Sequence, residues 1–141
     1  AAEIDGDVPP LSHRPRTRRG VISYAAKDIG ERLNARALVA VTSTGDTAKR
    51  VARLRSRLPL LVFTPSQAVR SQLALTWGAE TFLVEDVSNT DKMIHSLDEA
   101  PLSMDEYNYD DMMVVVAGSP PGIAGNTNMI QVHLLGQEHS K

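Results

Sequence analysis

Four hydroxyl side chains gather where an apolar run of strand length meets the start of a predicted helix. The run covers 37–42, and the hydroxyls around the following turn, which also contains Gly45, belong to Thr42, Ser43, Thr44 and Thr47. The first N–H groups of a helix have no partner within it and lie at the positive end of its dipole, so they attract anions. Hydroxyls donate hydrogen bonds to phosphate oxygens, and glycine lets the backbone come close to a ligand. The pattern predicts a binding site for a phosphate group.

The same turn has a second interpretation, in which no ligand is involved. Ser and Thr are favoured helix caps and Gly favours turns, so a plain helix cap is the alternative. The turn contains no Lys and no Gly-Lys-Ser/Thr, which excludes a nucleotide-hydrolysing P-loop.

A second loop follows another apolar run of strand length, at 112–117. It is rich in glycine and proline and includes amide and hydroxyl side chains; its candidate binding residues are Pro120, Pro121, Gly122 and Gly125. Loops that follow neighbouring parallel strands meet at one edge of a sheet. Two such loops could therefore close on one ligand.

The hydrophobic periodicity predicts the elements that position these loops. Apolar residues recur at spacings of three and four residues over 21–34, which indicates a helix that packs on a core. Alternation of strands and helices predicts parallel strands joined by right-handed crossovers, whereas the last strand follows without a helix and should be antiparallel. The other expected helices are 46–57, 66–77 and about 88–103, and the expected strands are 37–42, 60–64, 81–84, 112–117 and 129–135.

These elements predict the α/β fold class. We expect a single three-layer domain with a mostly parallel five-stranded sheet, helices on both faces and an antiparallel last strand. In a doubly wound sheet of this kind the strand at 37–42 lies beside the strand at 112–117. Ligands bind at the carboxyl ends of the strands that flank this switch point. The turn at 42–47 and the loop at 118–128 should then lie side by side.

The composition indicates one cytoplasmic domain. The chain has 141 residues, of which 42% are hydrophobic, and no Cys, which excludes disulfides, thiolate nucleophiles and Cys-ligated metals. No segment approaches the apolar length of a membrane span, and the first residues lack the features of a signal peptide. The chain opens without Met, from which we expect either processing or a piece of a longer protein.

Charge is divided unevenly between the two halves of the chain. Residues 1–70 carry 13 Lys and Arg against 6 Asp and Glu, whereas residues 71–141 carry 2 against 11. Such asymmetry can mark an anion-binding face, and solvated faces with ordinary ion pairs are the alternative. Nucleic acid is not an expected partner, because only 4% of the residues are aromatic and none is interleaved with the arginines.

Neither a catalytic residue nor a metal site is predicted. The four histidines are dispersed and lack the spacing of metal ligands. The acidic pairs at 105–106 and 110–111 precede a strand instead of following one, which places them at the wrong edge of a sheet for chemistry.

Between residues 21 and 135 the chain carries an ordered set of segments: the helix at 21–33, the strand at 37–42, Thr44-Gly45-Asp46-Thr47-Ala48, Phe63-Thr64-Pro65, and Gly118, Gly122, Gly125, Thr127 and Asn128. This set resembles the carboxyl-terminal domain of pyruvate kinase, and the actinobacterial branch looks most similar.

The resemblance implies a regulatory domain that lacks the catalytic barrel. Residues 1–19 would then be the connector from the barrel, 20–136 the α/β domain and 137–141 a tail. In this family the parent transfers a phosphoryl group from phosphoenolpyruvate to ADP in glycolysis, uses Mg²⁺ and K⁺, and forms a homotetramer. The domain by itself would hold no cofactor and catalyse nothing.

The resemblance also implies a site for an allosteric effector. Its phosphate would be held by the turn with Thr42, Ser43, Thr44, Gly45 and Thr47, and the loop over 120–125 would close on it. Ser43 stands where animal forms have Lys, and no Trp and Arg pair lies near 90–95. A monophosphate such as glucose 6-phosphate or AMP therefore fits better than fructose 1,6-bisphosphate.

Two further expectations concern function and assembly. The alternative function is a free-standing small α/β enzyme or phosphometabolite-binding protein, which would need a nucleophile or base at a strand's carboxyl end, where only Asp46 qualifies. The last strand, 129–135, carries more apolar surface than an edge strand should leave in water. This predicts self-association.

Overall fold

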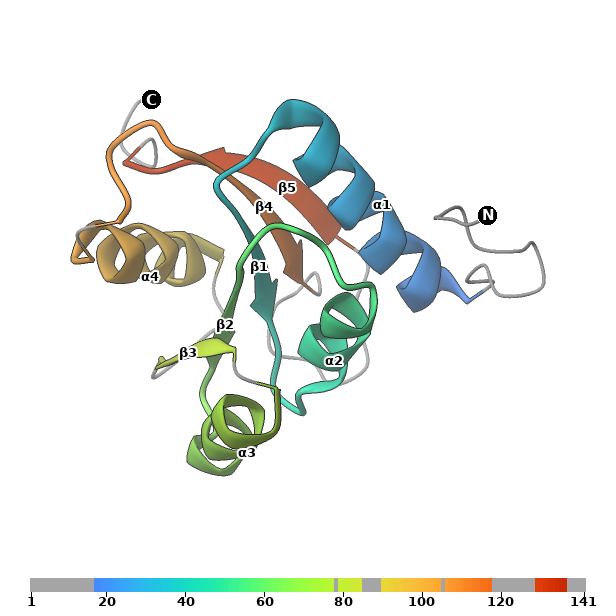
Figure 1. Ribbon diagram of the computed structural model, residues 1–141. Coiled ribbons are helices and arrows are strands. Elements are labelled where there is room, and N and C mark those ends of the chain that lie inside the picture. Colours follow the sequence, from blue (N-terminus) through green and yellow to red (C-terminus); the bar gives the residue numbers. More distant parts are fainter. Residues whose placement is uncertain (1–16, 78, 85–89, 105, 118–128, 137–141) are drawn as a thin grey trace.

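The computed structural model describes residues 17–77, 79–84, 90–104, 106–117 and 129–136 (Figure 1). Most of the expected connector, the expected tail and the loop at 118–128 lie outside the described residues. The elements in chain order are α1 (Arg18–Leu33), β1 (Ala37–Val41), α2 (Asp46–Arg53), β2 (Leu60–Thr64), α3 (Gln67–Trp77), β3 (Glu80–Leu83), α4 (Thr90–Leu102), β4 (Met112–Ala117) and β5 (Met129–Leu134).

The strands form one five-stranded sheet in the order β3-β2-β1-β4-β5. Four strands are parallel, and β5 runs antiparallel to β4. Val39 in the middle of β1 pairs with Leu61 on one side and with Val115 on the other. The predicted fold class and the predicted position of β1 beside β4 are therefore confirmed.

Helices cover both faces of the sheet, as Figure 1 shows. Successive side chains of a strand point to opposite faces, so β1 contributes to two cores. Val39 packs with Leu97 of α4 on one face, whereas Leu38 packs with Ala26 of α1 on the other. On that second face, Ala48 of α2 and Leu73 of α3 complete the cover of the sheet. All five residues of β1 are buried, because helices lie over both sides.

Two helix boundaries differ from the sequence prediction. Helix α1 begins at Arg18, before the expected start, because the Thr17 hydroxyl accepts a hydrogen bond from Gly20 N at 3.1 Å and caps the helix. Helix α2 ends at Arg53 instead of 57, and Arg55 takes a left-handed backbone conformation with φ of 55°. The remaining boundaries agree within two residues.

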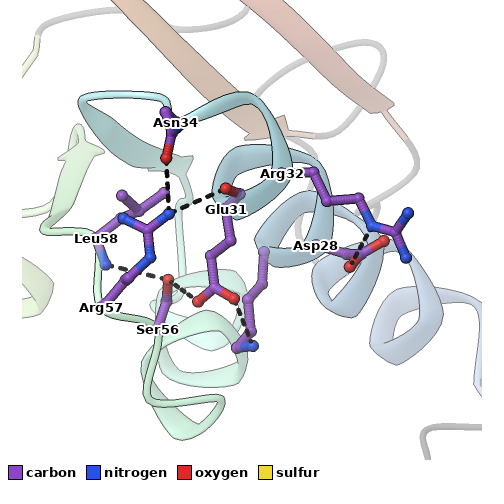
Figure 2. Close-up of polar contacts among 8 residues, drawn as sticks. Asp28, Glu31, Arg32, Asn34, Ser56, Arg57 and Leu58 are labelled. Carbon is purple, nitrogen blue, oxygen red and sulfur yellow. Dashed lines mark hydrogen bonds and ion pairs between the residues drawn. The ribbon is translucent and has the colours of Figure 1, made fainter.

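A polar cluster, which we call the 31–57 clasp, joins the end of α1 to the turn after α2 (Figure 2). The Glu31 carboxylate accepts hydrogen bonds from Ser56 Oγ at 2.8 Å and from Lys27 Nζ at 3.1 Å. Arg57 Nη2 donates to the Glu31 carbonyl and to Asn34 Oδ1, each at 3.0 Å. These bonds hold the 54–58 turn against α1 and so stop α2 from continuing along its axis.

Replacement of Glu31 by Gln should lower the free energy of unfolding by about 1 kcal/mol near neutral pH and by less in acid. Burial raises the pKa of the Glu31 carboxyl, but hydrogen bonds from Ser56 and Lys27 outweigh it and leave that pKa below its ordinary value. A carboxyl with a lowered folded-state pKa stabilises the fold above its unfolded-state pKa, and this contribution is lost as pH falls through the folded-state value.

Urea unfolding of wild type and Glu31→Gln at about pH 7 and about pH 3 measures this difference. Asp28→Asn is the matched control, because Asp28 pairs with Arg32 on the same helix at 3.1 Å but the Arg32 side chain is 80% exposed and that of Asp28 is 48% exposed. A gap between wild type and Glu31→Gln that persists unchanged in acid would contradict the prediction.

Candidate anion-binding site

The turn between β1 and α2 lies at the carboxyl edge of the sheet, at the predicted switch point. Ala40 pairs with Val116, so the ends of β1 and β4 are neighbours and the turn leaves the sheet beside β4. Five of the sequence-predicted residues come together here, in the turn and the first helical turn: Thr42, Ser43, Thr44, Gly45 and Thr47. The other four, Pro120, Pro121, Gly122 and Gly125, lie outside the described residues.

Gly45 is the N-cap of α2, and its backbone has φ of 96°. Its carbonyl accepts the first helical hydrogen bond, from Lys49 N at 3.0 Å, but it has no side chain to cap the helix. A Cβ at this position would lie 3.3 Å from Val69 Cγ1 of α3. Gly45 therefore combines a left-handed conformation, a close approach to α3 and a helix start without a cap from its own N-cap residue.

Two threonine hydroxyls hold the turn. Thr42 is buried, and its Oγ1 accepts a hydrogen bond from Gly45 N at 2.8 Å. Thr44 is exposed, and its Oγ1 accepts from Asp46 N at 3.3 Å. A hydroxyl that accepts a bond from an N–H group keeps its own hydrogen to donate. Each threonine can thus brace the turn and still bind an anion, so the helix-cap and phosphate-site interpretations are compatible.

The side chain of Lys49 lies close to this turn, although sequence analysis did not include it among the site residues. Its Cε is 3.8 Å from the position that a Cβ on Gly45 would take. Side chains in a helix lean toward its N-terminus, so a residue four positions after the N-cap comes to lie over it. The spacing from Gly45 to Lys49 is the sequence signal that could have identified this residue.

The two charged side chains at the turn, Lys49 and Asp46, should have opposite effects on a bound anion. Lys49 forms no ion pair within the described ranges, and a cation near the start of a helix opposes the helix dipole. An anion bound in the turn would relieve that unfavourable arrangement. Asp46 is exposed in the first turn of α2, where its carboxylate favours the helix dipole but repels an anionic ligand.

The neighbouring turn, between β2 and α3, shows what a capped helix looks like in the same sheet. Thr64 is fully buried, and its Oγ1 accepts a hydrogen bond from Ser66 N at 3.2 Å. Ser66 Oγ in turn accepts from Val69 N at 3.2 Å, which is the usual side-chain cap. Of these two adjacent helix starts, α2 is the one whose N-cap residue makes no side-chain hydrogen bond to the helix.

The acidic pair before β4 has a structural role at the opposite edge of the sheet. Asp111 Oδ2 accepts hydrogen bonds from Asn108 N at 2.9 Å and from Arg36 Nη1 at 3.3 Å.

Within the described ranges, no group of three or more His, Cys, Asp or Glu side chains is placed to hold a metal ion. In the same part of the chain, no helix has both the length and the apolar character needed to cross a membrane.

Comparison with known proteins gives a consistent set of relatives. The family model described as "Pyruvate kinase, alpha/beta domain" matches residues 21–133. A pyruvate kinase of Corynebacterium efficiens is 72% identical over 137 residues, covering 97% of this chain and 29% of the relative. One from Mycobacterium tuberculosis is 58% identical over 130 residues, covering 92% and 28%.

A solved structure shares the fold. The crystal structure of a pyruvate kinase from Cryptosporidium parvum matches with a TM-score of 0.75 at 17% identity, over 86% of this chain and 23% of that chain. At this identity the likeness concerns the fold alone. The chain spans less than a third of the length of these two pyruvate kinases.

Proposed function

Because this chain belongs to the pyruvate kinase family, as its C-terminal α/β domain, we propose that it binds a phosphorylated effector and helps the parent enzyme assemble. The observation that carries the effector half of the proposal is the glycine-capped start of α2 at the switch point of the sheet. The assembly half is supported by β5, a partly exposed strand at the end of the sheet as far as the structure describes it.

The proposed ligand is a monophosphate, with glucose 6-phosphate and AMP as the compounds to test. The positive end of the α2 dipole would attract one phosphate. The hydroxyls of Thr42 and Thr44 accept from Gly45 N and Asp46 N and keep their own hydrogens to donate to it. The ammonium of Lys49 would supply a compensating positive charge. Ser43, Thr47 and the loop over 120–125 complete the proposed site.

Catalysis is proposed to belong to the part of the parent enzyme outside this chain. The parent reaction would be phosphoryl transfer from phosphoenolpyruvate to ADP with Mg²⁺ and K⁺, in the cytoplasm. A coupled assay of pyruvate formation with the purified chain should therefore show only the background rate. Turnover that survives removal of contaminating enzyme would contradict this.

The charges at the turn provide the test of the effector site. Lys49→Met should weaken the binding of glucose 6-phosphate or AMP about fivefold, because an attractive charge is lost, and Asp46→Asn should tighten it about threefold, because a repulsive one is lost. Isothermal titration calorimetry of each variant, with inorganic phosphate as a further probe, measures both effects.

Arg32→Met is the control for a general effect of net charge, because Arg32 is an exposed cation on α1 whose side chain pairs with Asp28. It should leave the affinity unchanged. The effector site would be placed wrongly if Lys49→Met and Asp46→Asn shifted affinity in the same direction, or if neither shifted it more than Arg32→Met does.

Self-association should occur through β5, which pairs with β4 alone among the strands that the structure describes. Val132 is largely exposed there, and the unpaired backbone groups of an edge strand can pair with a second copy. Sedimentation velocity over a concentration series should show a dimer that Val132→Lys converts to monomer. Leu75→Lys, at a more exposed leucine on α3, should leave it intact. A wild-type monomer at every concentration would contradict the assembly role.

A further inference from the structure

A buried acidic side chain ties α4 to the edge strand. Asp98 of α4 and His133 of β5 are each only 5% exposed, and His133 Nε2 lies 2.7 Å from Asp98 Oδ1. The same oxygen accepts a second hydrogen bond, from Gly136 N at 2.9 Å. Asp98 thus holds both a side chain of β5 and the backbone just beyond its end.

The direction of His133 follows from the register of the sheet. His133 pairs with Met113, which packs in the core beneath α4 together with Leu97 and Leu135. The imidazole therefore faces α4, whereas its neighbour Val132 faces the opposite side and is largely exposed. The tie to Asp98 lies on the buried face of β5, not along the edge that has no strand partner within the described residues.

The residues that follow β5 are held from the other side as well. Leu135 N donates to the Asp111 carbonyl at 3.0 Å, and Asp110 N donates to the Leu135 carbonyl at 2.9 Å. Gly136 has φ of 84°, and a Cβ there would overlap the ring of Tyr109. The chain beyond the last strand is thus clamped between α4 and the 107–111 turn.

The burial of the Asp98 carboxylate is unfavourable unless its hydrogen bonds compensate for it. Its second oxygen, Oδ2, is buried without a hydrogen-bond partner among the described residues. A buried carboxylate with an unpartnered oxygen is unfavourable, so the two bonds at Oδ1 must compensate for it. By contrast, His95 and Glu99 form an exposed pair at 3.5 Å on the same helix, and pairs of that kind contribute little.

We propose that Asp98 is a positioning residue for the assembly edge: through His133 and Gly136 it holds β5 in the geometry that pairs with a second copy of this chain. An edge strand with one neighbour frays easily at its end, and pairing between copies requires both strands to be regular. This inference rests on the proposed assembly role. It adds that the edge needs the contact from α4 as well as the backbone bonds to the 107–111 turn.

The test compares variants of the whole 141-residue chain. In His133→Leu, leucine fills a similar volume but cannot donate a hydrogen bond to Asp98. In His133→Gln, the side-chain amide again provides an N–H donor. His133→Leu should weaken self-association at least tenfold in sedimentation velocity and accelerate amide hydrogen exchange in β5 at least tenfold, with β1 unchanged. His133→Gln should recover most of both properties, and His95→Gln should behave as wild type.

Every outcome of this comparison bears on the inference. Equal behaviour of His133→Leu and His133→Gln, or faster exchange spread evenly over β1 and β5, would overturn it, because the pair would then support only general stability. Unchanged affinity for glucose 6-phosphate in these variants would separate the edge from the effector site.

Two further results keep the inference and the assembly proposal apart. If the wild-type chain is monomeric, the assembly role fails, and exchange in β5 alone then decides whether Asp98 positions the strand. If His133→Leu does not fold, Asp98→Asn replaces the charged acceptor by a neutral one. It should accelerate exchange in β5 alone, and wild-type exchange in this variant would overturn the inference.

Discussion

Replacement of Thr42 by Val should weaken the binding of glucose 6-phosphate or AMP by about tenfold to a hundredfold, which corresponds to roughly 1.5 to 3 kcal/mol. Thr42 is buried at the end of β1, and its hydroxyl accepts a hydrogen bond from Gly45 N at 2.8 Å. Valine has nearly the same shape but no hydroxyl. The variant therefore loses a donor to the phosphate and also the bond that keeps Gly45 in place.

Thr64→Val is the matched control for this experiment. Thr64 is a buried threonine at the end of the adjacent strand, and its hydroxyl braces the β2–α3 turn in the same manner, by accepting from Ser66 N. Both variants should lose similar amounts of stability in urea unfolding, while only Thr42→Val loses affinity in calorimetry. Equal affinities of Thr42→Val and wild type would show that the β1–α2 turn is a helix cap without a ligand.

Gly45→Ala should lower the free energy of unfolding by about 2 kcal/mol, because the left-handed conformation is unfavourable for a residue with a Cβ. The backbone φ of 96° lies in that region, and the new Cβ would press on Val69 Cγ1 at 3.3 Å. The corresponding decrease in Tm is roughly 8 °C for a domain of this size. Affinity for the phosphorylated ligand should also fall about tenfold, because the first turn of α2 shifts away from its position.

Gly30→Ala separates the two effects of the Gly45 variant. A Cβ on Gly30 would meet Leu38 Cδ2 at 2.8 Å and Leu58 Cδ1 at 2.9 Å, so this change overpacks the core beneath α1. It should lower Tm while leaving ligand affinity as in wild type. If Gly45→Ala loses stability but binds as tightly as Gly30→Ala, the proposed phosphate does not bind at the start of α2.

Much of the fold could be predicted from local pattern and chain chirality. The strands β1 and β4 are continuous apolar runs because each is buried on both faces, and such runs are visible without a structure. Right-handed crossovers then leave few possible strand orders, and the predicted placement of β1 beside β4 was correct. The end of α2 was predicted wrongly. It depends on Ser56 and Arg57 contacting α1, which no local pattern reveals.

The residue types of the candidate site were evident in the sequence, but the structural role of each residue was not. The five predicted site residues between 42 and 47 are all reasonable cap or ligand residues by type. The backbone conformation of Gly45 and its approach to Val69 make glycine the N-cap and leave Thr42 to brace the turn from a buried position. The fold of α2 also brings Lys49 over the turn, and sequence analysis did not include this residue in the site.

The sequence by itself determined the family, the strands with their order, and the hydroxyl-rich turn, because these follow from short-range pattern and from the handedness of crossovers. Only the tertiary structure decided which dispersed polar residues become partners. His133 was one of four scattered histidines in the sequence. It contacts Asp98 because its imidazole points to the face of the sheet that α4 covers. Such pairs depend on how layers pack over long sequence separations, and hydrophobic periodicity carries no information about them.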